Sequence, residues 1–492
     1  MESTVGLSSD PNLQDEKNDI SLDDAVETGM PKQPMTGLVL GAAIIMSLQS
    51  FIFGCGIGMP NNSSPAMTYD GTGDLFPGEP ATFDPPITSD QFSWILSLFA
   101  VGGMIGGLAG GTLVKMLGPK LSSLITDVVF IAAGFIMAFA PNYGVMMAGR
   151  IVLGVASGLC CNCVPIYNND IAPVHVRGAF GVFHQLFITV GILVANVLGM
   201  QSVFGNPSLW WILWGSPVVF SGIHIVVMFF LPDSPKFLFE KGKDTQAKVA
   251  LTKFRGVDYD ATAELDEFLA AQKAAEEDGE VGLAEQFRIL FSKSYIKQAT
   301  IAIVLMTGQQ LSGINAVMFY SNTIFASAGM TNAEVATIMV SAFNVVATFP
   351  AIPIIEKAGR KILLIGGFGG QGVMHIMFVV ALIFEWQWPS VIFVLVGVAF
   401  FAVGPGPIPW MMAAELLPTK VSSAGQSVVV VVNWLFTFVI GLVYPLMNDA
   451  LDEYSFLPFA VCCALVVVYT VLFVPETKGK TIGDIEAMFG NA

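Results

Sequence analysis

The chain has 492 residues, of which 54% are hydrophobic and only 12% carry a charge, and its mean hydropathy is +0.69. Soluble domains are about a quarter charged, so this composition excludes an ordinary soluble protein and indicates one dissolved mainly in lipid. The formal net charge of −16 comes from acids in tails and loops. Nothing in the sequence indicates nucleic-acid binding.

The first 36 residues are acidic and poor in apolar side chains. They lack the basic start and the apolar run of a secretory signal. A segment of this composition buries too little apolar surface to fold, so we expect residues 1–36 to form a disordered acidic tail.

Twelve apolar segments follow, each close to the roughly 20 helical residues that cross a bilayer core of about 30 Å. They lie near residues 37–60, 91–114, 121–141, 143–165, 178–200, 208–231, 297–326, 333–355, 362–384, 389–414, 423–447 and 456–474. The polar stretch between the sixth and seventh segments has short amphipathic patterns, which predict small helices on the membrane face. The expected fold is an all-α membrane protein with an N-terminal six-helix bundle at 37–231, a cytoplasmic helical linker at 232–296, a C-terminal six-helix bundle at 297–474 and a short cytoplasmic tail at 475–492.

The basic residues predict the orientation. With both termini cytoplasmic, all of the 22 Lys and Arg residues except Arg150 fall on the inner side, as the positive-inside rule requires. The loop 61–90 is then external and contains two overlapping glycosylation acceptors, Asn61 and Asn62. Whether these acceptors are used stays open.

Three short motifs recur after nearly the same number of residues, which indicates an internal repeat. The paired positions are Gly118 and Gly359, Asp170 and Glu415, and Asp233 and Glu476, at separations of 241, 245 and 243 residues. Duplicated halves with a site at their interface are typical of alternating-access transporters.

The same motifs place acids and bases where helices meet the cytosol. Exposed ion pairs contribute only about 0–1 kcal/mol each, so a set of them suits a gate that breaks in every cycle, although loops can also simply be charged. The expected cytoplasmic gate residues are Asp170, Arg177, Asp233, Lys236, Glu356, Arg360, Lys361 and Glu415, with Asp170 paired to Arg177, Asp233 to Lys236, and Glu356 to Arg360 and Lys361.

Polar side chains inside the apolar spans carry the functional prediction, since lipid offers them no partner. They are Gln185, Gln309, Gln310, Asn315, Asn344 and Asn433, with Trp410 and Trp434 nearby. Amides donate and accept hydrogen bonds, as sugar hydroxyls do, and an indole face suits the apolar face of a pyranose. We therefore expect a site for a neutral polyol, with helix–helix contacts as the alternative role of any single amide.

The six cysteines all lie in apolar runs. Three of them cluster at Cys160, Cys161 and Cys163, but no neighbouring residue completes a metal site. We expect buried packing residues, no metal and no cofactor.

The runs QQLSGINAVMFYS, GPGPIPW, PDSPK, PETKGK, VPIYNNDIAP and EKAGRK together resemble the sugar porter family of the major facilitator superfamily, close to eukaryotic facilitative glucose transporters. The resemblance covers about residues 40–485 and implies two six-helix halves and an alternating-access cycle. By position it implies sugar contacts at Gln185, Ile188, Ile192, Gln309, Gln310, Asn315, Asn344, Phe401, Trp410 and Asn433.

Four departures from the family pattern matter. Proton-coupled members carry an Asp in a GYD motif of the first span, where this chain has Gly54-Cys55-Gly56, so Gly56 stands at the position of the acid. Ala402 replaces a sugar-contacting Glu, which removes an acceptor and can broaden specificity. The motif at Gly118 is degraded and Ser422 stands where an Arg is expected, so we expect a thinner inner gate than usual.

We therefore predict facilitated diffusion of a hexose, glucose first, through a functional monomer, most simply in the plasma membrane. Proton symport through Asp127 is the alternative, as is another polyol such as inositol or xylose. A sugar receptor is disfavoured because the chain ends at Ala492, soon after Glu476. A membrane enzyme is disfavoured because no Ser–His–acid set, metal cluster or phosphate loop lies among the spans.

Overall fold

The computed structural model describes residues 33–72, 75–277, 282–478, 480 and 482–489. Throughout these residues the regular structure is helical, which confirms the all-α prediction. Eleven helices or helix pairs are long and apolar enough to cross a bilayer, and the 17-residue helix Leu457–Phe473 is a shorter twelfth. Most of the predicted tail 1–36 lies outside the described residues.

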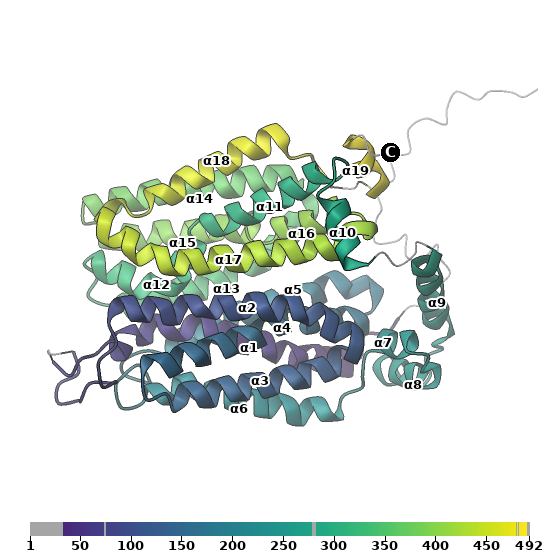
Figure 1. Ribbon diagram of the computed structural model, residues 1–492, viewed down its shortest axis with the longest axis horizontal. Helices are drawn as coiled ribbons and strands as arrows, with labels where there is room; N and C mark the ends of the chain where they lie inside the picture. Colours follow the sequence, from purple (N-terminus) through teal and green to yellow (C-terminus); the bar gives the residue numbers. More distant parts are fainter. Residues whose placement is uncertain (1–32, 73–74, 278–281, 479, 481, 490–492) are drawn as a thin grey trace, which may run out of the picture.

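The first six spans pack side by side as one group (Figure 1). They are α1 (Gly37–Met67), α2 (Ser89–Leu117), α3 (Pro119–Ala138), α4 (Tyr143–Ile171), α5 (Arg177–Leu198), preceded by the short 3₁₀ turn Val174–Val176, and α6 (Trp210–Phe230). Local sequence sets their ends: Thr88 and Gln91 form a capping box at the start of α2, and Asn142 accepts from Val145 N–H at the start of α4.

The first span is longer than the apolar run suggested. Helix α1 continues through Pro60 and Pro65 to Met67, so the first residues of the expected external loop 61–90 are helical. The two prolines are tolerated because neighbouring helices surround this turn, where Met59 and Ala66 are fully buried.

Four short helices gather at one end of the spans, the right-hand end in Figure 1. They are α7 (Pro235–Glu240), α8 (Asp244–Arg255), α9 (Thr262–Glu277) and α10 (Leu283–Leu290). The buried pair Arg255–Glu264, at 2.9 Å, joins α8 to α9, and Arg255 also donates to the carbonyl of Ile171 at the end of α4. These helices therefore mark what we call the linker end of the molecule.

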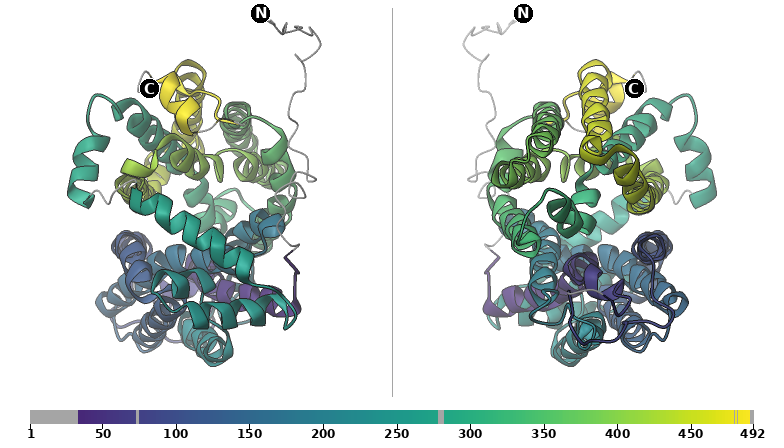
Figure 2. Two further views of the ribbon diagram at one scale, coloured as in Figure 1. Left: turned by 90° about the vertical axis from the view of Figure 1, so that its right-hand side faces the viewer. Right: turned by 90° about the vertical axis from the view of Figure 1, so that its left-hand side faces the viewer.

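The remaining spans form a second group, coloured from teal through green to yellow in Figures 1 and 2. They are α11 (Ile296–Leu311), α12 (Ile314–Ser327), α13 (Ala333–Lys357), α14 (Arg360–Ile383), α15 (Gln387–Val403), α16 (Ile408–Leu416), α17 (Thr419–Leu451), the 3₁₀ turn Asp452–Tyr454, α18 (Leu457–Phe473) and the short terminal helix α19 (Ile482–Met488).

Two spans of this second group are interrupted. The seventh span divides into α11 and α12 at Ser312-Gly313, where Gly313 has φ +85°. The tenth divides into α15 and α16 at Gly404-Pro405-Gly406-Pro407, where the prolines have no N–H to continue the helical hydrogen bonds. Irregular backbone at membrane depth is tolerated where protein surrounds it or where it lines a cavity, so both interruptions are candidate ligand sites.

Candidate functional site

Four amide side chains that were expected to contact the sugar form one hydrogen-bonded network beside the two interruptions: Gln309, Gln310, Asn315 and Asn433. Gln309 Nε2 donates to the carbonyls of Pro405, at 2.8 Å, and Gly406, which ties α11 to the break in the tenth span. Gln310 Nε2 donates to Gln309 Oε1 at 3.2 Å, and Asn433 Nδ2 donates to the same oxygen at 3.1 Å.

The network also crosses the break in the seventh span. Asn315, in the first turn of α12, donates to Gln310 Oε1 in α11. Gln309 and Gln310 are only 3% and 5% exposed, so their polar groups lie inside the protein. A cluster of uncharged donors and acceptors is thus assembled from α11, α12, the tenth-span break and α17.

Thr437 is a member of this network that sequence reasoning missed. Its hydroxyl lies 3.3 Å from Gln310 Oε1 and 3.2 Å from Asn315 Nδ2. The signal was its position four residues after Asn433, which puts both side chains on one face of α17.

The other expected contact residues lie outside this network. Gln185 is exposed on α5, Asn344 is half-buried on α13, Phe401 is half-buried on α15, and Trp410 is 37% exposed on α16. Ile188 and Ile192 are buried at 7% and 4% exposure, where the backbone of α5 packs against glycines of α1.

Trp434 brings α17 of the second group against the first. Its ring centroid lies 5.9 Å from that of Phe53 in α1 and 5.8 Å from that of Phe99 in α2. The indole fits because Gly103 on α2 leaves it room. The amide network and this aromatic contact lie on the same helix, so α17 links the candidate site to the interface between the halves.

Asn61 and Asn62 join α1 to α12 at the end away from the linker. Asn61 Nδ2 donates to Ser321 Oγ at 2.7 Å and to the carbonyl of Met318 at 3.1 Å, and its Oδ1 accepts from Asn322 N–H. Asn322 Nδ2 donates to Asn62 Oδ1 at 2.9 Å. We call these contacts of Asn61 and Asn62 with α12 the distal clasp.

The distal clasp bears on the two glycosylation acceptors, whose use the sequence leaves open. Asn61 and Asn62 are 2% and 0% exposed and the amide nitrogen of each is hydrogen bonded. A transferase needs an accessible acceptor nitrogen on a surface segment, so in this conformation neither residue is available.

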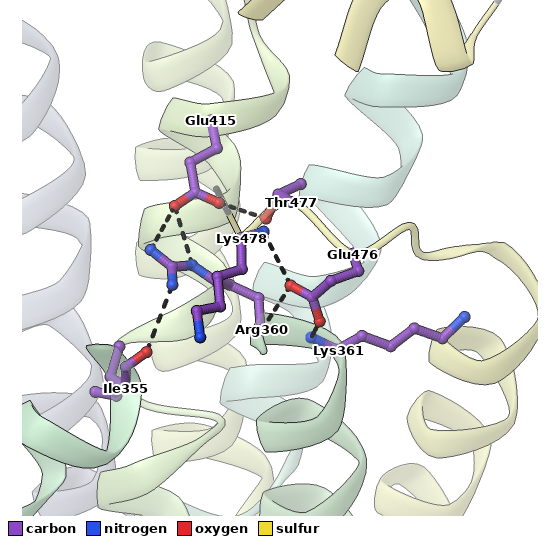
Figure 3. Close-up of polar contacts among 7 residues, drawn as sticks. All are labelled: Ile355, Arg360, Lys361, Glu415, Glu476, Thr477 and Lys478. Carbon is purple, nitrogen blue, oxygen red and sulfur yellow. Dashed lines mark hydrogen bonds and ion pairs between the residues drawn. The ribbon is translucent and has the colours of Figure 1, made fainter. Parts of the chain in front are cut away.

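At the linker end, the charged residues of the second group form a local cluster (Figure 3). Arg360 pairs with Glu415 at 3.1 Å, and Thr477 donates to the other oxygen of Glu415. The Glu476 carboxylate accepts from the backbone N–H groups of Arg360, at 2.8 Å, and Lys361, at 3.1 Å. It therefore sits on the N-terminus of α14, where an anion is favoured.

These contacts differ from the expected gate pairs. Arg360 pairs with Glu415, and its expected pair with Glu356 lies outside the described side chains. Asp170 accepts from Ser234 Oγ at 2.6 Å and forms no ion pair with Arg177 among the described residues. Asp233 accepts from Ser234 N–H, and Lys236 is not within ion-pair distance of it among the described residues. Asp170 thus contacts the start of α7, and Glu476 contacts the start of α14.

A pH-dependent contribution of Glu476 to stability follows from its surroundings. Burial raises the pKa of this carboxyl group, but the N–H groups of Lys478, Arg360 and Lys361 outweigh that effect, so its pKa lies below the ordinary value. A depressed pKa stabilises the fold above the unfolded-state pKa of about 4.3, and the contribution is lost as the pH falls through the lower, folded-state value. We expect Glu476→Gln to lower the melting temperature at pH 7, with a gap that closes below about pH 4.

The control for this prediction is Glu453→Gln, at an exposed carboxylate. It should leave the melting temperature unchanged at both pH values. A gap for Glu476→Gln that is the same at pH 7 and pH 4 would contradict the assignment.

A buried ionisable pair lies inside the first group. His224 Nδ1 of α6 and Asp127 Oδ2 of α3 are 2.6 Å apart, and Gln49 of α1 donates to Asp127 Oδ1 at 2.9 Å. All three residues are 0% exposed.

The six cysteines are free, and Cys163 contacts Gln49 at 3.4 Å.

Two groups of helices that meet along an interface, with broken helices and uncharged polar groups beside it, define a secondary membrane transporter. The family model described as "Sugar (and other) transporter" matches residues 41–489, and the chain belongs to that family. It is 34% identical over 472 residues to the human solute carrier family 2, facilitated glucose transporter member 4, covering 93% of this chain and 92% of the relative. It is also 34% identical over 475 residues to member 1 from Gallus gallus, covering 94% and 95%.

Solved structures agree on the fold. The inward-open xylose transporter of E. coli superimposes with a TM-score of 0.74 at 23% identity, covering 92% of this chain and 99% of the other. The bromodeoxyglucose complex of that proton:xylose symporter gives a TM-score of 0.72 with the same coverage. This chain is therefore a sugar transporter with the twelve-helix major facilitator fold, embedded in a membrane as a multi-pass protein.

Proposed function

We propose that this protein carries a hexose, most simply glucose, by facilitated diffusion through alternating access. The observation that carries the proposal is the uncharged network of Gln309, Gln310, Asn315, Asn433 and Thr437 beside two helix breaks. Millimolar binding corresponds to about −4 kcal/mol, which several neutral hydrogen bonds at about 1 kcal/mol each supply. The relatives named for facilitated glucose transport support the choice of sugar.

The polar contacts between the halves support a state closed at the distal end. The distal clasp joins α1 to α12, and Asn196 Nδ2 of α5 donates to Ser341 Oγ of α13 at 2.8 Å. The ion pairs between described residues each stay within one half or within the linker. We propose that the linker end is cytoplasmic, with both termini there, and that the distal end faces the outside at the plasma membrane.

Uniport is favoured over proton symport by the surroundings of Gly56. The guanidinium of Arg150 donates to the Gly56 carbonyl at 2.6 Å and to the Ile95 carbonyl at 3.1 Å, and none of the described ion pairs includes Arg150. The first-span stretch Gly54–Gly56 offers it no carboxylate. The proposed cycle therefore includes no acid at this position that binds and releases a proton.

Asp127→Asn tests the coupling. Asp127 of α3 is fully buried against α6 and α1. We therefore expect both the variant and the wild type to take up glucose without a sugar-evoked change in pH. The measurement is the pH of a weakly buffered suspension of cells or proteoliposomes on addition of glucose. Alkalinisation in the wild type that disappears in Asp127→Asn would replace uniport by symport.

The function itself is tested by uptake of labelled glucose into proteoliposomes at several pH values. Fructose, galactose, xylose and inositol serve as competitors. Saturable, pH-independent uptake that glucose competes best is expected. Better competition by xylose or inositol would identify another polyol as the substrate. Binding of glucose without flux would favour a receptor.

A further inference from the structure

The break in the seventh span leaves a backbone carbonyl without its helical partner. Helix α11 ends at Leu311 and Gly313 adopts φ +85°, packed against the ring of Phe459. The chain therefore turns out of the helical path directly after Ser312, and the Ser312 carbonyl loses the usual acceptor role within a helix. A buried carbonyl in this state costs free energy unless another donor reaches it.

Two side chains of α14 supply that donor. Gln371 Nε2 lies 3.1 Å from Ser312 O, and His375 Nε2 lies 2.7 Å from the same oxygen. Gln371 and His375 are four residues apart, so they occupy one face of α14, and they are 2% and 6% exposed. Two converging donors hold the carbonyl more firmly than either would alone.

Aromatic packing fixes the imidazole in this position. The ring centroid of His375 lies 5.4 Å from that of Phe456 and 6.3 Å from that of Phe459. Phe459 is the ring that also contacts Gly313. Side chains of α14 and α18 therefore hold the break together.

A small cavity adjoins Gln371 and His375. Its volume is about 10 Å³, and it is lined mainly by apolar side chains of α12, α14 and α15, among them Val317, Phe378 and Val394. Gln371 Oε1 is buried and has no hydrogen-bond partner within the described part of the chain. The cavity has room for at most about one water.

We propose that Gln371 and His375 form a latch that positions α12 at the Ser312–Gly313 break and so sets the closed position of the distal clasp. Helix α12 carries Ser321 and Asn322 of the clasp and Asn315 of the amide network. Holding the chain just before its first turn therefore links the site to the clasp. The consequence for transport rests on the proposed function, whereas the latch itself is tested without any sugar.

The experiment is hydrogen–deuterium exchange of the purified protein in lipid nanodiscs without sugar. The variants are Gln371→Leu, His375→Phe and the double substitution. Each replaces a hydrogen-bond donor by an apolar side chain of similar size. We expect exchange over residues 314–327 to be about tenfold faster in the double variant, since an unpaired buried carbonyl favours local opening. Exchange over α3 and α4 should not change.

Two further variants make the result specific. Gln298→Leu removes a buried amide of α11 that has no partner among the described residues, and it should leave exchange in α12 unchanged. His375→Gln keeps an N–H donor and should restore slow exchange. In proteoliposomes, His375→Phe should lower the maximal rate more than it changes the KM for glucose, because the latch positions α12 without touching the sugar.

Unchanged exchange in α12 of the double variant would overturn the latch, and so would equal acceleration by Gln298→Leu. Acceleration spread over all helices would also overturn it, because it would mean general unfolding. A latch confirmed by exchange in a protein that fails to transport glucose would instead count against the proposed function.

Discussion

Replacing Gln310 by alanine is expected to weaken glucose binding by about thirtyfold while the protein stays folded in the membrane. The amide of Gln310 bonds to Gln309 and accepts from Asn315 and Thr437. We expect the substitution to cost the bound sugar about two neutral hydrogen bonds, each contributing about 1 kcal/mol. The measurement is the binding of labelled glucose to purified wild-type and variant protein.

The matched control is Gln298→Ala. Gln298 lies on the same helix, is 0% exposed, and has no hydrogen-bond partner for either amide atom among the described residues. Its removal should leave glucose binding within about twofold of the wild type, because it loses no contact at the site. Equal affinities of Gln310→Ala and the wild type for glucose would show that the amide network is not part of the binding site.

Replacing Arg150 by methionine is expected to cause the largest loss of stability among single substitutions in the first half. Arg150 is 0% exposed and donates to carbonyls of α1 and α2, and its guanidinium lies 4.6 Å from the ring of Phe99 and 5.8 Å from that of Trp214. One buried side chain thus joins four helices. Pro60 has no N–H to offer the Gly56 carbonyl four residues before it, so losing Arg150 leaves this buried carbonyl without a donor, at a cost of about 1–3 kcal/mol. We expect the melting temperature in detergent to fall by a few degrees.

An exposed arginine provides the comparison for Arg150. The side chain of Arg288 in α10 is 82% exposed and pairs with Glu285 at 3.7 Å. Such surface pairs contribute about 0–1 kcal/mol, so Arg288→Met should change the melting temperature little. If Arg150→Met has the same melting temperature as the wild type, the two carbonyl contacts of Arg150 do not stabilise the fold.

Much of the fold was predictable because lipid imposes a simple rule on sequence. A span must be apolar and helical over about 20 residues, and the described helices follow the expected segments closely. The extension of α1 to Met67 was missed because polar Asn61, Asn62 and Ser63 end the apolar run. Asn61 and Asn62 have partners on α12, more than 250 residues later, and Ser63 accepts from Trp214 of α6. No local pattern could reveal that these residues are buried.

The site was predictable in its chemistry and less so in its pairing. Amides inside apolar spans stand out in a sequence, and Gln309, Gln310, Asn315 and Asn433 do lie together. Thr437 was missed because one hydroxyl in an apolar helix can satisfy itself on its own backbone, as its 2.9 Å bond to the Asn433 carbonyl shows. The pairing of Arg360 with Glu415 depends on how α14 meets α16, which spacing along the chain does not determine.

A cryo-electron microscopy map of the protein with bound glucose tests the central claim most directly. We expect the sugar within hydrogen-bonding distance of Gln309 or Gln310 and of Asn315 or Asn433, between the two halves and beside the breaks in the seventh and tenth spans. A sugar bound elsewhere, with these amides paired only to each other, would contradict the account.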